Sequence, residues 1–125
     1  MNVKTDTKEK FVVITPGEPE LSANMAGDFQ RLLEAQMNTV VSHLVLNMEE
    51  VRYVSKKVAE ILIHSQQQYY ENHFSFVICC LQKQVENALD EMEILELMNV
   101  TPTESEAWDI VQMEEIEREI MGGED

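Results

Sequence analysis

The residues whose types and spacing best suit a binding site are Tyr53, Ser55, Lys56, Lys57 and Glu60. An apolar run gives way to an amphipathic one at this point, so we expect a junction where a strand leads into a helix. The first N–H groups of such a helix face solvent and favour negative charge. The two lysines oppose that helix dipole, and Glu60 can pair with Lys56 only in the weaker order. Ser55 suits an N-cap, which contributes about 1 kcal/mol.

No set of residues in the sequence predicts an enzyme active site or a metal centre. The histidines stand alone, and the glycines form no phosphate-binding pattern. Two adjacent cysteines on a strand point to opposite faces, so we expect small buried thiols in a reducing compartment rather than a disulfide. Glutamate pairs are common on the surface of so acidic a chain. We therefore predict no catalytic residue, no metal and no cofactor. The residues concerned are His43, His64, His73, Gly17, Gly27, Gly122, Gly123, Cys79, Cys80, Glu49, Glu50, Glu114 and Glu115.

Charge and length narrow the class of partner. The chain has 125 residues, 24 acidic and 9 basic, for a net charge of −15. We expect one domain over residues 1–125, with its core at about 11–120. A chain this acidic has no general footprint for nucleic acid and is repelled by anionic membranes, so we expect protein partners. With no signal peptide and no apolar run of membrane-spanning length, we expect a cytoplasmic location and no membrane insertion.

Hydrophobic patterning predicts an α/β fold, with a short N-terminal hairpin strand followed by four strand–helix units. The predicted strands span residues 2–6, 11–14, 43–47, 74–81 and 95–100, and the helices start near residues 24, 55, 83 and 103. Alternating units of this kind form a mostly parallel or mixed sheet with helices packed against it. The capping box Thr103-Glu104-Ser105-Glu106 opens the last helix, which runs through Ala107, Ile110, Val111, Ile116 and Ile120 to Gly122-Gly123. Met113 and Met121 on this acidic helix are candidates for an exposed contact.

With its elements in this order, the chain resembles the STAS domain family, named for sulfate transporters and anti-sigma factor antagonists. The resemblance runs from about Phe11 to Ile120 and rests on joint order and spacing. Leu21 takes the leucine position of a turn into the first helix, and the second and third core strands are also similar. The stretches that carry it are GEPELSANMAGD at 17–28, HLVLNM at 43–48, residues 51–62 and FSFVICC at 74–80.

The chain departs from the family pattern at its regulatory motif. Ser55 falls on the motif's Asp or first Ser, Lys56 on the serine that family regulators use as phosphoacceptor, and Val58 on the glycine. A lysine cannot be phosphorylated in this way, so we expect no phosphoswitch at Lys56. For Ser55, capping and phosphorylation both remain open.

The resemblance implies a non-catalytic module similar to an anti-sigma factor antagonist. It would bind an anti-sigma factor or serine-kinase-like protein through the junction from Tyr53 to Lys57 and the helix that follows. The alternatives are a structural STAS subunit of a signalling scaffold or transport assembly, and a STAS domain that binds an anion or nucleotide at the Ser55–Lys57 helix terminus.

Overall fold

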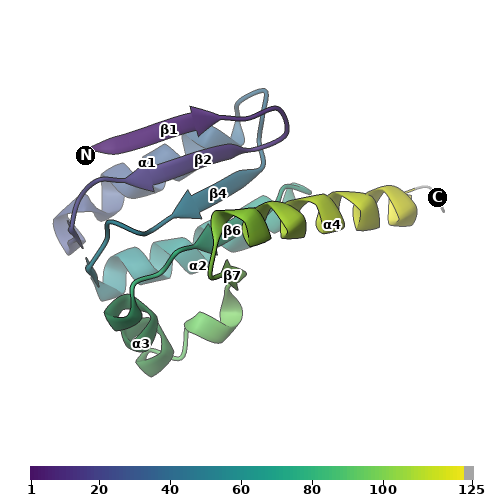
Figure 1. Ribbon diagram of the computed structural model, residues 1–125. Coiled ribbons are helices and arrows are strands. Elements are labelled where there is room, and N and C mark those ends of the chain that lie inside the picture. Colours follow the sequence, from purple (N-terminus) through teal and green to yellow (C-terminus); the bar gives the residue numbers. More distant parts are fainter. Residues whose placement is uncertain (123–125) are drawn as a thin grey trace.

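The computed structural model describes residues 1–122, and a five-stranded mixed sheet lies at its centre (Figure 1). The strand order is β1-β2-β4-β6-β7, in which β1 is antiparallel to β2 and the other neighbours are parallel. A separate two-stranded sheet joins β3 to β5 in parallel. The strands are β1 (Val3–Thr7), β2 (Val12–Pro16), β3 (Glu20–Leu21), β4 (Leu44–Asn47), β5 (Tyr53–Val54), β6 (Phe76–Cys79) and β7 (Val100–Thr101).

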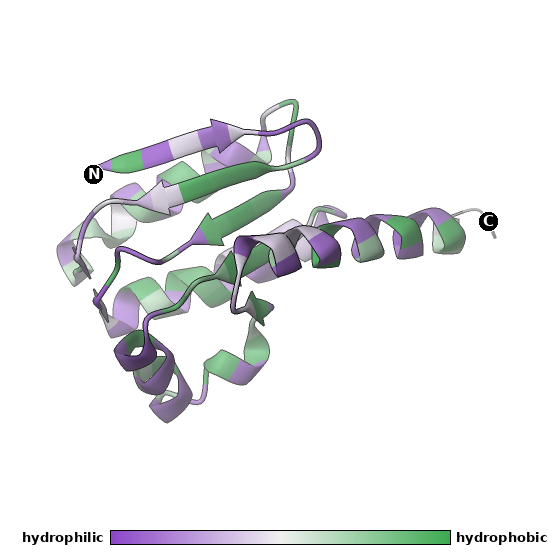
Figure 2. Cartoon of the chain, in the orientation of Figure 1, coloured by the Kyte–Doolittle hydropathy of each residue, from purple (hydrophilic) through white to green (hydrophobic). Residues whose placement is uncertain are grey.

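Helices cover both faces of the sheet. The long helices α1 and α2 lie behind it in Figure 1, and α4 crosses its front. Strand residues alternate between these layers: Val12 and Ile14 belong to the core cluster shared with α1 and α2, whereas Val13 belongs to the cluster shared with α4. Figure 2 shows the matching contrast between hydrophobic inner strands and helices of mixed character. The helices are η1 (Ala23–Met25), α1 (Ala26–Met37), α2 (Lys56–Glu71), α3 (Lys83–Glu91), η2 (Leu95–Leu97) and α4 (Glu104–Gly122).

The predicted fold class is confirmed, but two strand boundaries are wrong. Residues 95–97 form a 3₁₀ turn, and the last strand is confined to Val100–Thr101. The apolar side chains Ile94 and Met98 are buried in the main core without a strand around them, which is why the sequence pattern misleads. The strand predicted over 74–81 is shortened to Phe76–Cys79. Cys79 is buried, as expected, but Cys80 leaves the strand with a φ of 62° and is only half-buried.

Two helices are followed by a residue in the left-handed backbone region, His73 after α2 and Glu93, with a φ of 61°, after α3. In α2, the N–H of Phe74 donates to Tyr69 O and the N–H of His73 donates to Tyr70 O, which is the Schellman pattern. His73 supplies the left-handed residue, with a φ of 65°.

At the start of α4, the Thr103 hydroxyl accepts from the N–H of Glu106 at 3.2 Å, as the capping box predicts. Of the predicted Gly122-Gly123 stop, Gly123 lies outside the described residues.

Candidate partner-binding site

The candidate site begins with the small sheet formed by β3 and β5. The N–H groups of Arg52 and Tyr53 donate to Pro19 O at 2.7 and 3.1 Å, and the N–H of Ser55 donates to Leu21 O at 2.9 Å. Leu21 and Val54 are buried, so this ladder fixes the chain just before α2 starts. Two of the segments that carry the family resemblance, 17–28 and 51–62, therefore lie side by side.

Ser55 is the N-cap of α2. Its backbone is extended, with φ −69° and ψ 158°, and its hydroxyl accepts from the N–H of Val58 at 3.1 Å. Its carbonyl accepts the first helical bond, from the N–H of Ala59 at 2.9 Å. Only 6% of Ser55 is exposed. The hydroxyl is thus both engaged and shielded, which is the arrangement of a structural cap.

Unlike Ser55, the charged residues of the junction face solvent. Lys56, Lys57 and Glu60 are exposed, and Tyr53 is 53% exposed beside them. Within residues 1–122, no ion pair joins Lys56 to Glu60, so the predicted compensation of charge is not made. The structure brings Tyr53 and the lysines to one surface and leaves Ser55 beneath it.

Arg52 is a further candidate site residue that the sequence reasoning missed. It is exposed immediately before Tyr53, so three of the chain's nine basic residues fall within six positions. Among the described residues, Arg52, Lys56 and Lys57 take part in no ion pair. The clustering of basic residues in an otherwise acidic chain could have indicated Arg52, but hydrophobic periodicity does not detect such clustering. We call Arg52, Tyr53, Lys56 and Lys57 the junction surface.

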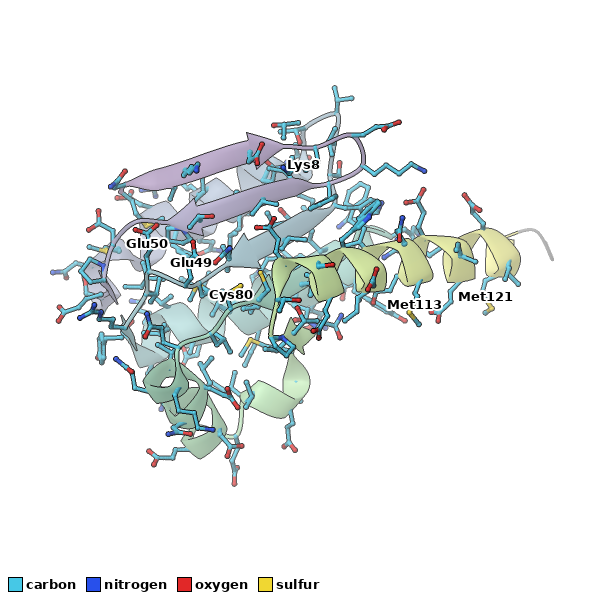
Figure 3. All side chains as sticks on the ribbon, viewed as in Figure 1. Lys8, Glu49, Glu50, Cys80, Met113 and Met121 are labelled. Carbon is cyan, nitrogen blue, oxygen red and sulfur yellow. The ribbon has the colours of Figure 1, made fainter. Side chains whose placement is uncertain are left out.

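The other residues considered for chemistry do not form a centre with the junction surface. Glu49 and Glu50 are exposed in the loop after β4, and Cys80 follows β6 (Figure 3). Gln82 donates to Glu49 O at 2.6 Å and so fastens this loop to the start of α3. Burial raises the pKa of the Cys79 thiol, and neighbouring Cys80 adds to the shift, so a reactive thiolate is disfavoured. In the described part of the chain, no three His, Cys, Asp or Glu side chains are placed to hold a metal ion.

Comparison with known proteins identifies the family. The family model described as the STAS domain matches residues 2–107. The chain belongs to the STAS domain family. No curated protein sequence matches it significantly. Among residues 1–122, no helix is both long enough and apolar enough to cross a membrane.

Solved structures show how widely this fold is shared. A candidate anti-sigma factor antagonist from Thermotoga maritima superposes with a TM-score of 0.79 at 16% identity, covering 88% of this chain and 94% of that one. The unphosphorylated anti-sigma factor antagonist SpoIIAA gives 0.69 at 15% identity, with coverage of 89% and 96%. A structure of the stressosome, a signal integration and transduction hub, gives 0.65 at 16% identity, with coverage of 87% and 96%. At these identities the similarity establishes the STAS fold.

Proposed function

We propose that this STAS domain is a non-catalytic, cytoplasmic binding module that acts like an anti-sigma factor antagonist. Its partner is a regulatory protein of the anti-sigma factor or serine-kinase type, and the contact is made by the junction surface and the exposed side of α2. The fold shared with anti-sigma factor antagonists supports the class of function. The junction surface supports the position of the contact.

The observation that carries this proposal is the exposed basic surface at the start of α2. Two lysines at a helix N-terminus are opposed by the helix dipole, at about 0.3–1 kcal/mol each. In this chain of net charge −15, neither lysine is neutralised by an ion pair within residues 1–122. An acidic surface on a partner would remove that opposition. Tyr53 adds an aromatic side chain of the kind that contributes strongly to protein interfaces.

We further propose that phosphorylation at the usual serine position does not switch this domain. By the family pattern, Lys56 occupies that position, and the neighbouring hydroxyl of Ser55 is buried and caps α2. To be phosphorylated, Ser55 would have to give up its bond to the N–H of Val58 and leave its pocket. Incubation with the partner kinase and ATP tests this directly. Phosphate on Ser55 that is absent from Ser55→Ala would refute the unswitched module.

A charge-reversal experiment tests the contact itself. The partner to use is an ATPase of the anti-sigma factor type encoded beside this gene, with affinity measured by isothermal titration calorimetry. We expect the double variant Lys56→Glu/Lys57→Glu to bind at least about tenfold more weakly. The matched control is Lys4→Glu/Lys8→Glu, which changes net charge equally through exposed lysines of the β1–β2 hairpin. Equal loss in both variants, or no loss in either, would show that the junction surface is not the interface.

A second function from a different class is favoured by the stressosome likeness: a fixed subunit of a signalling scaffold. The two functions differ in stoichiometry and exchange. A scaffold subunit co-purifies in a large assembly that is stable to dilution, whereas a regulator forms a small complex that exchanges with free partner. Size-exclusion chromatography with light scattering on material purified from the native source separates the two.

A further inference from the structure

In the second half of α4, polar side chains face the body of the domain and apolar side chains face outward, which is the opposite of the first half. In the first half, Ala107 and Val111 are buried against the sheet, and Trp108 stacks on Phe11 with ring centroids 4.6 Å apart. Beyond Val111 no residue up to Met121 is fully buried, and the helix projects past the sheet (Figure 1). This is the part of the chain that follows the family match, which ends at residue 107.

Polar residues occupy the inner side of that projecting half. The Arg118 guanidinium donates to the Ser75 hydroxyl at 2.8 Å and pairs with Glu114 at 3.7 Å. Glu115 lies 3.9 Å from the Lys10 ammonium group and 4.0 Å from His43 Nε2. The Arg118–Glu114 pair lies within α4, whereas the contacts to Ser75, Lys10 and His43 hold the helix against the amino ends of β4 and β6. The inner side thus needs no apolar residue for its attachment.

Apolar residues occupy the outer side instead. Met113, Ile116 and Ile120 follow the i, i+3, i+7 spacing of one helix face and are 59%, 55% and 60% exposed. Met121 is 69% exposed and projects from the same side as Met113 in Figure 3. Figure 2 shows the corresponding hydrophobic bands on this half of α4. We call these four residues the α4 stripe.

A helix end that is surrounded only by water would carry polar residues on its outer side, whereas this one carries apolar residues there. Large apolar side chains in solvent give up the free energy of burial, about 25 cal/mol per Å². Isolated exposed apolar residues are common, but a row at helical spacing indicates a covered surface. An open groove of about 370 Å³ also borders α4, where it is lined by Glu114, Leu97 and Tyr70. Leu97 and Tyr70 are 58% and 75% exposed, and this groove lies on the inner side of α4, apart from the stripe.

Charge decides which kind of partner covers the stripe. Among residues 104–122, α4 has seven acidic residues and one arginine, for a net charge of −6. Asp109, Glu117 and Glu119 are exposed around the stripe. A second copy of this chain would bring two such helices together, and like charges at close range oppose that pairing. The same charge repels an anionic membrane. A basic partner is attracted.

We propose that the α4 stripe is a second docking surface, which binds an amphipathic helix of a protein partner that carries an apolar stripe flanked by lysine and arginine. The apolar stripes pack together, and the flanking basic residues meet Asp109, Glu117 and Glu119. This is helix-on-helix recognition with anchors at i, i+3 and i+7. It is separate from the junction surface, which is basic and would attract an acidic partner.

A synthetic peptide tests this surface without knowledge of the natural partner. The probe is a peptide of about 18 residues with leucine at i, i+3 and i+7 spacing and lysine elsewhere. We expect it to shift the backbone NMR signals of residues 113–121 and to bind more weakly as salt is raised. The double variant Ile116→Gln/Ile120→Gln keeps the net charge and should weaken binding about tenfold or more. Tyr53→Gln removes an equally exposed side chain from the junction surface and should leave peptide binding unchanged.

Three results would overturn the proposal. If the peptide binds the double variant as tightly as the wild type, charge alone attracts it and the stripe is not a docking surface. If a peptide with glutamate in place of lysine binds as well, the partner is not selected by basic residues. If sedimentation velocity shows a dimer that Ile116→Gln/Ile120→Gln abolishes, the stripe binds a second copy of this chain. Circular dichroism on each variant confirms that α4 remains folded.

Discussion

The role of Ser55 as a cap predicts a measurable loss of stability in Ser55→Ala. The substitution removes the acceptor for the N–H of Val58, a bond of 3.1 Å in buried surroundings. Loss of an N-cap with a donor left unpaired costs about 1–2 kcal/mol. For 125 residues, an unfolding entropy of about 2.1 cal/mol/K per residue amounts to about 260 cal/mol/K. The melting temperature should therefore fall by about 4–8 °C in differential scanning calorimetry.

Ser22 provides the matched control for this prediction. It too is an N-cap in extended backbone, with φ −82° and ψ 167°, but its side chain makes no capping hydrogen bond. We expect Ser22→Ala to change stability by no more than about 0.5 kcal/mol. If Ser22→Ala and Ser55→Ala lower the melting temperature equally, the hydroxyl of Ser55 contributes nothing as a cap. The reasoning that keeps Ser55 from acting as a phosphoacceptor would then fail.

Three further predictions concern stability. Ser65 is buried, and its hydroxyl has no hydrogen-bond partner within residues 1–122. Ser65→Ala should therefore raise the free energy of unfolding by about 0.5–1 kcal/mol in urea unfolding. A lower free energy of unfolding would show that the hydroxyl makes a hydrogen bond after all. His73 has a φ of 65°, so His73→Gly should stabilise by about 0.5 kcal/mol, and a loss would indicate that the imidazole makes a needed contact. Burial lowers the pKa of His43 from its ordinary value of 6.5, and Arg118 lowers it further, although Glu115 and Glu114 oppose the shift. The unfolded state therefore binds more protons, and stability should fall as pH drops below about 6.5, where protonation would also remove the acceptor for the N–H of Ser75. Urea unfolding at about pH 5.5 and about pH 7.5 should show this fall in the wild type and less of it in His43→Asn.

The sequence predicts the order of strands and helices along the chain, because each core strand is a local apolar run followed by a helical pattern. The small sheet of β3 and β5 could not be predicted in the same way. Each strand is two residues long, and the pairing joins segments more than thirty residues apart, Glu20 with Tyr53 and Leu21 with Val54. Nothing in the local pattern around Pro19 indicates that its carbonyl accepts from two N–H groups of the junction. The sequence thus predicts that the candidate site residues lie at one junction, but it does not predict the hydrogen bonds that position them.

The last helix shows a different limit. Its apolar residues Ala107, Val111, Ile116 and Ile120 are all compatible with one helix, and periodicity alone does not show which of them face the sheet. The structure divides them: the first two are buried and the last two are exposed. The predicted exposure of Met113 and Met121 is confirmed, whereas the contact suggested for them stays a prediction. The division arises because α4, with 19 residues, is longer than the four-residue strands β4 and β6 along which it runs, and which part of the helix lies over the sheet is a tertiary property.

The two proposed surfaces lie at opposite ends of the parallel strands, and this has a consequence for binding. The junction surface is near the carboxyl ends, because β5 and the start of α2 follow the loop that leaves the carboxyl end of β4 (Figure 1). The α4 stripe is near the amino ends, where Arg118 and Glu115 contact Ser75 and His43. One surface is basic and the other acidic, so the partners they attract differ in charge and need not compete. A module built this way can hold two different proteins at once. The peptide probe should accordingly bind with the same affinity whether or not the junction surface is occupied.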